Sequence, residues 1–215
     1  MRLKPCDSSE EKNKDLRLLI KTVTRAFEIY NVTYWVDYGT ALGAYRYCDV
    51  IPWDHDADIS YLNTDYTKVV KAAEEVNKQN GFSMDPEKAF FRNQSLDLFP
   101  WEKVKNWLSF SSVYKFVTGK TETDENYRMY QVNKAENYAL KTYILNVFLE
   151  NFPAVYLSNR SRVQFADFKV YTVRNLSEFV RWKYYFTHNK VVPFYLDCLN
   201  KFYNATGGMT KCVSH

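Results

Sequence analysis

Apolar side chains recur every three or four residues over residues 8–30, which predicts a helix with one apolar face. Residues 33–38 are rich in β-branched and aromatic side chains and predict a strand that ends at Gly39-Thr40. A short helix over residues 41–47 and a second strand over residues 53–61 follow. The chain therefore begins with the order helix, strand, glycine turn, helix, strand.

The same kinds of pattern predict two further helices, a strand and a hairpin in the rest of the chain. They indicate a helix over 64–80, a strand over 95–101, a β-hairpin over 163–173 that turns at Ala166-Asp167, and a closing helix over 176–186. Residues 102–150 are aromatic and polar without a clean period. Only 6 Gly and 6 Pro occur, which disfavours a β-sandwich built on glycine turns. The expected fold class is α+β, with a mixed β-sheet flanked by helices in a single domain.

Polarity divides the chain into three expected parts. Residues 1–14 form a polar N-terminal extension, residues 15–190 the folded domain, and residues 191–215 a C-terminal tail packed on the domain or extending from it. No stretch approaches the ~18 apolar residues of a membrane span, and the polar start lacks the apolar segment of a signal peptide. We expect the chain as it stands to be soluble.

The composition is that of a folded protein, since 46% of the residues are hydrophobic and 25% are charged. The net charge is +4, and residues 151–215 carry 9 Lys and Arg against 3 Asp and Glu. Such a bias occurs in proteins that bind a diphosphate or another anion, although dispersed charges more often form only a solvated face. The charge is therefore compatible with an anionic partner without identifying one.

Two features bear on the cellular compartment. The chain contains five Asn-x-Ser/Thr sequons, a number suggestive of a glycosylated, luminal protein, at Asn31, Asn93, Asn159, Asn175 and Asn204. The four cysteines show no C-x-x-C pattern and no spacing with His that suits zinc. Cys198 and Cys212 could pair in an oxidising compartment, and two free thiols are an equal alternative.

The most informative segment is Asp54-His55-Asp56-Ala57-Asp58. In an extended chain the three Asp side chains point to one face, about 6.5–7 Å apart, and His55 points to the other. Carboxylates this close repel each other unless a cation lies among them, and oxygen ligands without Cys or clustered His favour Mg²⁺ or Mn²⁺. An exposed acidic loop is the alternative. An EF-hand calcium loop is excluded because Ile59 stands where that loop needs glycine.

Gly39-Thr40 provides a second element of a possible site. A glycine at the start of a helix lets backbone N–H groups approach a phosphate, and the helix dipole favours the anion. The ordinary interpretation of such a pair is a plain strand-to-helix turn. Its combination with Arg46 and the carboxylate strand, within about 20 residues, indicates a site that holds nucleotide phosphates between backbone amides and a metal.

These residues closely resemble the LicD, fukutin and fukutin-related protein family. The resemblance is carried by Tyr34–Arg46, by Val50–Asp58, and by Leu96–Pro100, which is similar to a later family strand with a further Asp. Residues 163–185 are similar to the family's C-terminal strands and helix. It implies a nucleotidyltransferase-like fold and the transfer of a phospho-alditol (ribitol or glycerol phosphate) or phosphocholine group from a CDP-linked donor to a glycan.

The resemblance also implies roles for individual residues. The residues that would contact the CDP-linked donor are Gly39, Thr40, Arg46, Trp53 and Asp54. The residues that would bind Mg²⁺ or Mn²⁺ are Asp54, Asp56 and Asp58, and the catalytic residues would be Asp56, Asp58 and Asp97. We expect in-line displacement at the β-phosphorus of the donor, with Asp97 or Asp58 as general base.

The expected partners are a CDP-activated donor and a glycan or glycoprotein acceptor, and no nucleic acid. The resemblance and the sequons together imply the Golgi or secretory-pathway lumen, with membrane association through an N-terminal anchor that this chain does not contain. Two other functions stay open. One is a nucleotidyltransferase that uses an NTP, and the other is a non-catalytic relative that acts as assembly partner of a glycan-modifying enzyme.

Overall fold

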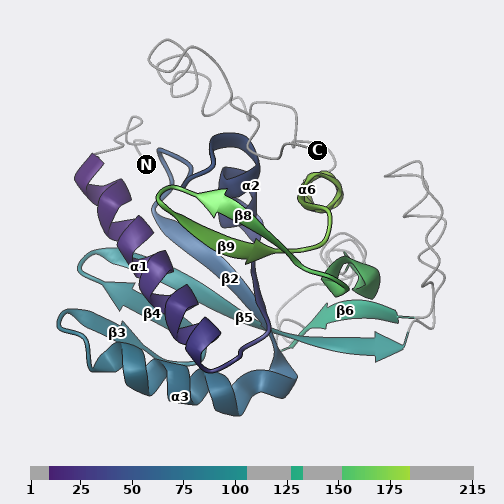
Figure 1. Cartoon of the computed structure of the whole chain (residues 1–215), viewed down its shortest axis with the longest axis horizontal. Coiled ribbons are helices and arrows are strands. Elements are labelled where there is room, and N and C mark those ends of the chain that lie inside the picture. Colours follow the sequence, from purple (N-terminus) through teal and green to yellow (C-terminus); the bar gives the residue numbers. More distant parts are fainter. Residues whose placement is uncertain (1–9, 106–126, 133–151, 185–215) are drawn as a thin grey trace, which may run out of the picture.

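The computed structural model describes residues 10–105, 127–132 and 152–184. Its main element is a sheet in which β1, β2, β5, β4 and β3 lie side by side in that order, and β6 pairs with β5 and with β7 (Figure 1). The strands are β1 Tyr34–Val36, β2 Asp56–Leu62, β3 Phe82–Met84, β4 Lys88–Phe91, β5 Gln94–Lys105, β6 Tyr127–Gln131 and β7 Phe152–Pro153. Because β2 and β5 are parallel while the other described pairs are antiparallel, the sheet is mixed.

Two helices, α1 (Glu10–Ile29) and α3 (Tyr66–Asn77), pack on one face of this sheet. The apolar stripe of α1 is buried, with Leu16, Leu19, Ile20, Val23 and Phe27 all at 1% exposure or less. The Phe27 ring meets the rings of Tyr34 on β1 and Tyr61 on β2, at centroid distances of 5.7 and 6.2 Å. The three- and four-residue spacing of the apolar positions thus becomes the contact between helix and sheet.

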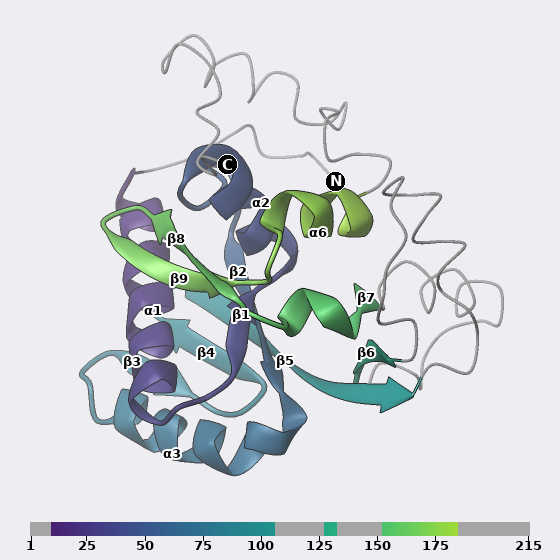
Figure 2. The ribbon, with the colours of Figure 1, turned by 45° about the vertical axis from the view of Figure 1, so that its right-hand side comes forward.

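The opposite face carries an aromatic cluster, which is covered by α6 (Leu176–Lys183) and the 3-10 turn Ala154–Leu157 (Figure 2). The Trp35 ring lies 6.3 Å from Trp101 and 6.0 Å from Phe152. Phe152 in turn lies 5.0 Å from Phe179 of α6. These contacts bury β1, β2 and β5 on both sides, so the strands that carry the acidic residues are held rigidly.

Helix α2 (Tyr38–Tyr47) follows β1 directly, and the hairpin of β8 (Ser161–Phe165) and β9 (Phe168–Thr172) lies beside α1 (Figure 1). An ion pair joins the hairpin to that helix, with Arg162 Nη2 2.9 Å from Glu28 Oε1. The hairpin turns at Ala166, where φ is 49°.

The sequence patterns predicted most of these elements, and the α+β class with a mixed sheet flanked by helices is confirmed. The helices expected over 8–30, 64–80 and 176–186 are α1, α3 and α6, and the hairpin expected over 163–173 is β8 and β9. The strand expected over 95–101 is β5, which continues to Lys105. Most of the irregular segment 102–150 lies outside the described residues.

Two predicted boundaries at the candidate site were wrong. Helix α2 begins at Tyr38 rather than at Ala41, so Gly39-Thr40 belongs to the first helical turn and not to a turn before the helix. Asp37 is the physical reason, since its side chain accepts a hydrogen bond from the Tyr38 N–H and caps the helix. Strand β2 begins at Asp56 rather than near Trp53, so Asp54 lies in the preceding loop.

Strands β3 and β4 were not expected, because each is only 3 or 4 residues long and the turn between them contains Pro86. Residues 10–14 are part of α1, and the rest of the N-terminal extension and the tail over 191–215 lie outside the described residues. The domain boundaries therefore stay predictions. Among the described helices, none combines the length and the apolar character needed to cross a bilayer.

Candidate functional site

The start of α2 is docked on the start of β2 by three hydrogen bonds to Asp58. The Gly39 N–H donates to Asp58 Oδ2 (3.0 Å), and the Asp58 N–H donates to Thr40 Oγ1 (2.8 Å). The Asp37 N–H donates to the Asp58 carbonyl (3.1 Å). A helix N-terminus and its partial positive charge are thus directed at an acidic side chain.

Gly39 is the point on which two carboxylates converge. A Cβ atom at this position would lie 2.8 Å from Asp54 Oδ2 and 3.3 Å from Asp58 Oδ2. The first distance is shorter than any normal contact, so only glycine lets both carboxylates lie against the helix start. The sequence analysis singled out this glycine for its backbone, and the structure shows the space that its missing side chain leaves.

Two aspartates of the acidic segment, Asp54 and Asp58, have raised pKa values. Burial and then the nearby charge of Asp56 raise the pKa of Asp54 to about 6. Burial likewise raises the pKa of Asp58 well above its usual value, and Asp56, Asp37 and Asp54 add to that shift by repulsion. Burial and mutual repulsion disfavour the ionised forms of these carboxylates, and a divalent cation bound among them would relieve this cost.

Asp97 lies on β5 in direct register with Asp58 on the parallel strand β2. Its Oδ1 accepts from Lys88 Nζ at 2.7 Å, and Lys88 lies opposite Asp97 on β4. The hydrogen bond to Asp97 raises the pKa of Lys88. The predicted fourth carboxylate is therefore beside the acidic segment, and it has a cationic partner that the sequence analysis missed.

The other residues predicted to contact the CDP-linked donor lie in α2 or close to it. Thr40 is 4% exposed, and its hydroxyl supports the backbone of Asp58. Arg46 lies in the last turn of α2, and the half-buried Trp53 packs its ring 6.0 Å from Tyr47. Contact of these three residues with a donor stays a prediction.

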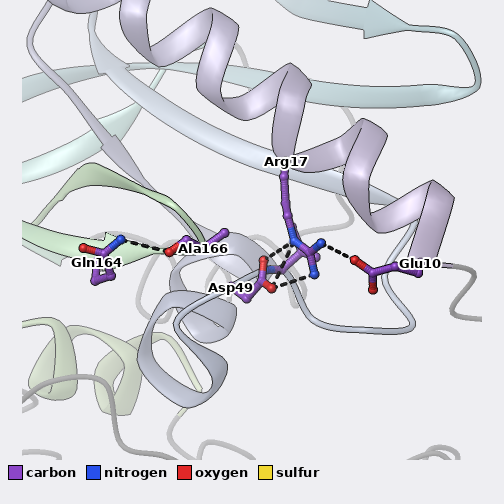
Figure 3. A network of polar contacts seen from close by, with 6 residues as sticks. Glu10, Arg17, Asp49, Gln164 and Ala166 are labelled. Atoms are coloured by element: carbon purple, nitrogen blue, oxygen red, sulfur yellow. Dashed lines mark hydrogen bonds and ion pairs between the residues drawn. The ribbon is translucent and has the colours of Figure 1, made fainter.

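The loop that leads into the acidic segment is anchored to α1, as Figure 3 shows. Arg17 binds Asp49 in a two-pronged contact, with Nε 2.8 Å from Oδ1 and Nη2 2.7 Å from Oδ2. The Ala166 N–H of the hairpin turn donates to the Cys48 carbonyl in the same loop. His55 is exposed on this loop, with Nδ1 3.1 Å from Lys12 Nζ.

Two residues of the C-terminal helix region reach the site and were not predicted as site residues. Burial raises the pKa of Tyr184, and the negative charges of Asp58, Asp37 and Asp54 add to the shift. Lys183 Nζ lies 3.3 Å from Asp37 Oδ1. No sequence pattern joins residues so far apart in the chain.

Cys48 is disulfide-bonded, and its partner lies outside the described residues. The predicted alternatives for Cys198 and Cys212 fall outside them as well. In the described part of the chain, no group of three or more His, Cys, Asp and Glu side chains is arranged so that it could hold a metal ion. The donor set at Gly39 consists of carboxylate oxygens with raised pKa values, and this chemistry fits a hard divalent cation.

Residues 31–175 match the family model described as the nucleotidyltransferase domain of LicD/FKTN/FKRP. An uncharacterised protein of Rickettsia prowazekii is 26% identical over 167 residues, which is 77% of this chain and 59% of that protein. Ribitol 5-phosphate transferase FKRP of Homo sapiens is 32% identical over 89 residues, which is 41% of this chain and 15% of that protein. The chain thus covers less than two thirds of the length of these relatives.

A solved structure of ANT(2'')-Ia in complex with adenylyl-2''-tobramycin is also similar, at 20% identity and a TM-score of 0.32. That likeness covers 39% of this chain and 48% of the other. The family match spans the described helix α2, the acidic segment and Asp97, all of which lie within residues 31–175. The chain belongs to the LicD/FKTN/FKRP nucleotidyltransferase-domain family.

Proposed function

We propose that this protein transfers a phospho-alditol or phosphocholine group from a CDP-linked donor to a glycan acceptor, with Mg²⁺ or Mn²⁺ as cofactor. The observation that carries the proposal is the convergence of Asp54 and Asp58 on the Gly39 backbone at the N-terminus of α2. Family membership supports it, since one relative is named a ribitol 5-phosphate transferase.

Asp54, Asp56 and Asp58 would hold the cation. A bound Mg²⁺ or Mn²⁺ supplies charge neutralisation for a diphosphate and for the leaving oxygen. The raised pKa values of Asp54 and Asp58 support this assignment, because burial first and mutual repulsion second disfavour their ionised forms, and a cation would offset both effects. Asp54 stands in a loop, so it can adjust to a ligand more easily than Asp58 on the buried strand.

The residues of this chain would then orient the reactants for in-line displacement. An acceptor hydroxyl attacks the β-phosphorus of the donor, the bond from that phosphorus to the bridging oxygen breaks, and CMP leaves. We assign the role of general base, which takes the proton of the hydroxyl, to Asp97. Asp97 is in register with Asp58 but lies outside the carboxylates gathered at Gly39, and its side chain is 31% exposed.

A donor screen with the purified chain tests the proposal. CDP-ribitol, CDP-glycerol and CDP-choline are compared with CTP and ATP, with release of CMP or pyrophosphate as readout. We expect CMP release from one of the CDP-linked donors, in the presence of Mg²⁺ and a glycan acceptor. Asp56→Asn should abolish this activity. The control is His55→Gln, which replaces the exposed residue between Asp54 and Asp56 and should leave the activity unchanged.

The other outcomes of the screen separate the alternatives. Pyrophosphate release from CTP or ATP would identify an NTP-dependent nucleotidyltransferase. A folded chain that neither binds nor turns over any donor would favour the non-catalytic assembly partner. Activity that survives Asp56→Asn would overturn the assignment of the metal site.

We propose the secretory-pathway lumen as the compartment. Three sequons lie at exposed residues, namely Asn31, Asn93 and Asn159, and Cys48 is disulfide-bonded, as is common in oxidising compartments. The partners proposed are the CDP-linked donor and a glycan or glycoprotein, with no nucleic acid. Localisation to the Golgi and membrane association through a preceding segment belong to the same proposal.

A further inference from the structure

Tyr38, the residue before Gly39, has a backbone conformation that bulky side chains rarely adopt. Its φ is 38°, in the left-handed region. Such a conformation persists only where the surrounding structure fixes it. The next N–H in the chain is that of Gly39, which donates to Asp58. Whatever holds Tyr38 in this conformation therefore also sets the direction of the Gly39 N–H.

Lys183, the last residue of α6, lies against Tyr38 and Asp37. Its Nζ is 4.2 Å from the centre of the Tyr38 ring and 3.3 Å from Asp37 Oδ1. The Lys183 side chain is 3% exposed and that of Asp37 is fully buried. The rings of Trp101, Phe152 and Phe179 surround Nζ at 4.6, 5.3 and 5.4 Å. Lys183 is thus a buried cation enclosed by aromatic rings and paired with one buried carboxylate.

Asp37 is fixed from several sides. Its Oδ2 accepts from Trp35 Nε1 (3.2 Å) and from Ser60 Oγ (2.7 Å), and its Oδ1 accepts from the Tyr38 N–H (2.8 Å). The Ser60 hydroxyl in turn accepts from Trp101 Nε1 at 2.9 Å. Through Asp37, the cation of Lys183 is connected to β1, β2, β5 and the first N–H of α2.

A gain in fold stability does not by itself explain this pair. Removing two charges from water costs about as much as their attraction returns, and apolar residues of similar volume often stabilise a core at least as well. In some proteins the benefit of a buried pair is that it fixes one arrangement of the chain. Here the arrangement that it touches is the left-handed Tyr38 next to Gly39.

We propose that Lys183 is a positioning residue for the site. Together with Asp37 it holds Tyr38 in its left-handed conformation, and so keeps the Gly39 N–H directed at Asp58. The proposal rests on the geometry around Gly39 and does not depend on the donor, the acceptor or the cation.

Amide hydrogen exchange, followed by NMR on the ¹⁵N-glycine-labelled chain, tests it. Gly43 in the middle of α2 is the internal control for the helix as a whole. Lys183→Met alone leaves the buried charge of Asp37 without the Lys183 cation, so the main variant is the double replacement Asp37→Asn with Lys183→Met. We expect protection of the Gly39 amide to fall about tenfold or more while that of Gly43 is kept. Arg181→Met, which removes an exposed charge from α6, should change neither.

A rescue variant separates positioning from ordinary packing. Adding Tyr38→Gly to the double variant should restore most of the protection at Gly39, because glycine adopts positive φ without support. A side chain that mattered only for packing would not be rescued by a further loss of volume. Wild-type protection of Gly39 in the double variant overturns the proposal, and so does failure of that variant to fold, since the pair would then specify the fold. Absence of rescue overturns it as well.

Discussion

Lys88 and Asp97 face each other across β4 and β5 and form an ion pair, with Nζ 2.7 Å from Oδ1. This pair places a positive charge directly beside the acidic segment, because Asp97 is in register with Asp58. The charge of Asp56 also contributes to the raised pKa of Lys88. The candidate site is therefore a group of four aspartates with Lys88 at its edge.

Replacing Lys88 with Met should strengthen the binding of a divalent cation and weaken catalysis. Removal of a positive charge a few ångströms from the carboxylates should tighten Mn²⁺ binding by about three- to tenfold at low salt. Loss of the contact that orients Asp97 should lower the transfer rate by about tenfold or more. Calorimetric titration with Mn²⁺ and the donor assay measure the two effects.

The matched control for this variant is Lys169→Met, which removes an exposed lysine from β9. It should change neither Mn²⁺ binding nor the transfer rate. Unchanged or weaker Mn²⁺ binding in Lys88→Met would show that the cation does not lie near Lys88.

Expression through the secretory pathway of a eukaryotic cell should give glycosylation at Asn31, Asn93 and Asn159. Each of these residues is exposed, and two of them have positive φ in turns. Asn175 should be unmodified, because its Oδ1 accepts from the Glu178 N–H (3.3 Å) and Ser177 Oγ (3.1 Å) at the N-cap of α6. Mass spectrometry after enzymatic removal of N-glycans in H₂¹⁸O reads each site. A modified Asn175 beside an unmodified Asn31 would contradict this ranking.

Replacing Asp65 with Asn should destabilise the fold in a pH-dependent way. Asp65 Oδ2 accepts from the Thr33 N–H (2.7 Å), and Oδ1 contacts Lys68 Nζ at 2.5 Å. Burial alone would raise its pKa, but the contacts with Lys68 and Thr33 outweigh burial and lower the pKa below the usual value of an aspartate. The ionised form is therefore favoured in the folded state, and its contribution is present above the unfolded pKa and lost as the pH falls through the folded pKa.

Urea denaturation checks this prediction. At pH 7, Asp65→Asn should lower the free energy of unfolding by about 1–2 kcal/mol, and the difference from wild type should narrow below about pH 4. Asp167→Asn is the control, since Asp167 pairs with Lys21 at an exposed position and should contribute little. A difference that widens in acid would refute the assigned sign.

The local part of the site could be predicted from the sequence. Asp54, Asp56 and Asp58 lie within five residues, and Gly39 precedes the first of them by 15 positions. These are short-range patterns that can be recognised without knowledge of the fold. The predicted start of α2 was wrong because the apolar pattern of β1 runs on to Tyr38, whereas the cap formed by Asp37 starts the helix there. Asp is a preferred N-cap residue and is depleted in strands, so Asp37 itself was the signal that could have placed the helix start correctly.

The long-range part could not be predicted. Lys88 reaches Asp97 because the antiparallel pairing of β4 with β5 sets their register, and the short strand β4 gave no signal of its own. Lys183 comes from a helix 146 positions after Asp37, and its amphipathic pattern marks it only as the end of α6. Contacts of this kind follow from sheet order and helix packing, which one sequence does not determine.

The two glycines of α2 offer the sharpest comparison of function with stability. In Gly39→Ala the new Cβ would meet Asp54 Oδ2, the end of a loop side chain that can move aside. The fold should therefore lose little stability, while the displaced carboxylate lowers the transfer rate by about 100-fold and weakens Mn²⁺ binding. In Gly43→Ala the new Cβ would lie 2.5 Å from the Asp49 carbonyl oxygen and 3.2 Å from the Ile51 nitrogen. Backbone atoms cannot yield so easily, so the free energy of unfolding should fall by about 1–3 kcal/mol. Urea denaturation, Mn²⁺ titration and the donor assay on both variants test the contrast, and equal effects of the two variants on stability would show that Gly39 is only a packing residue.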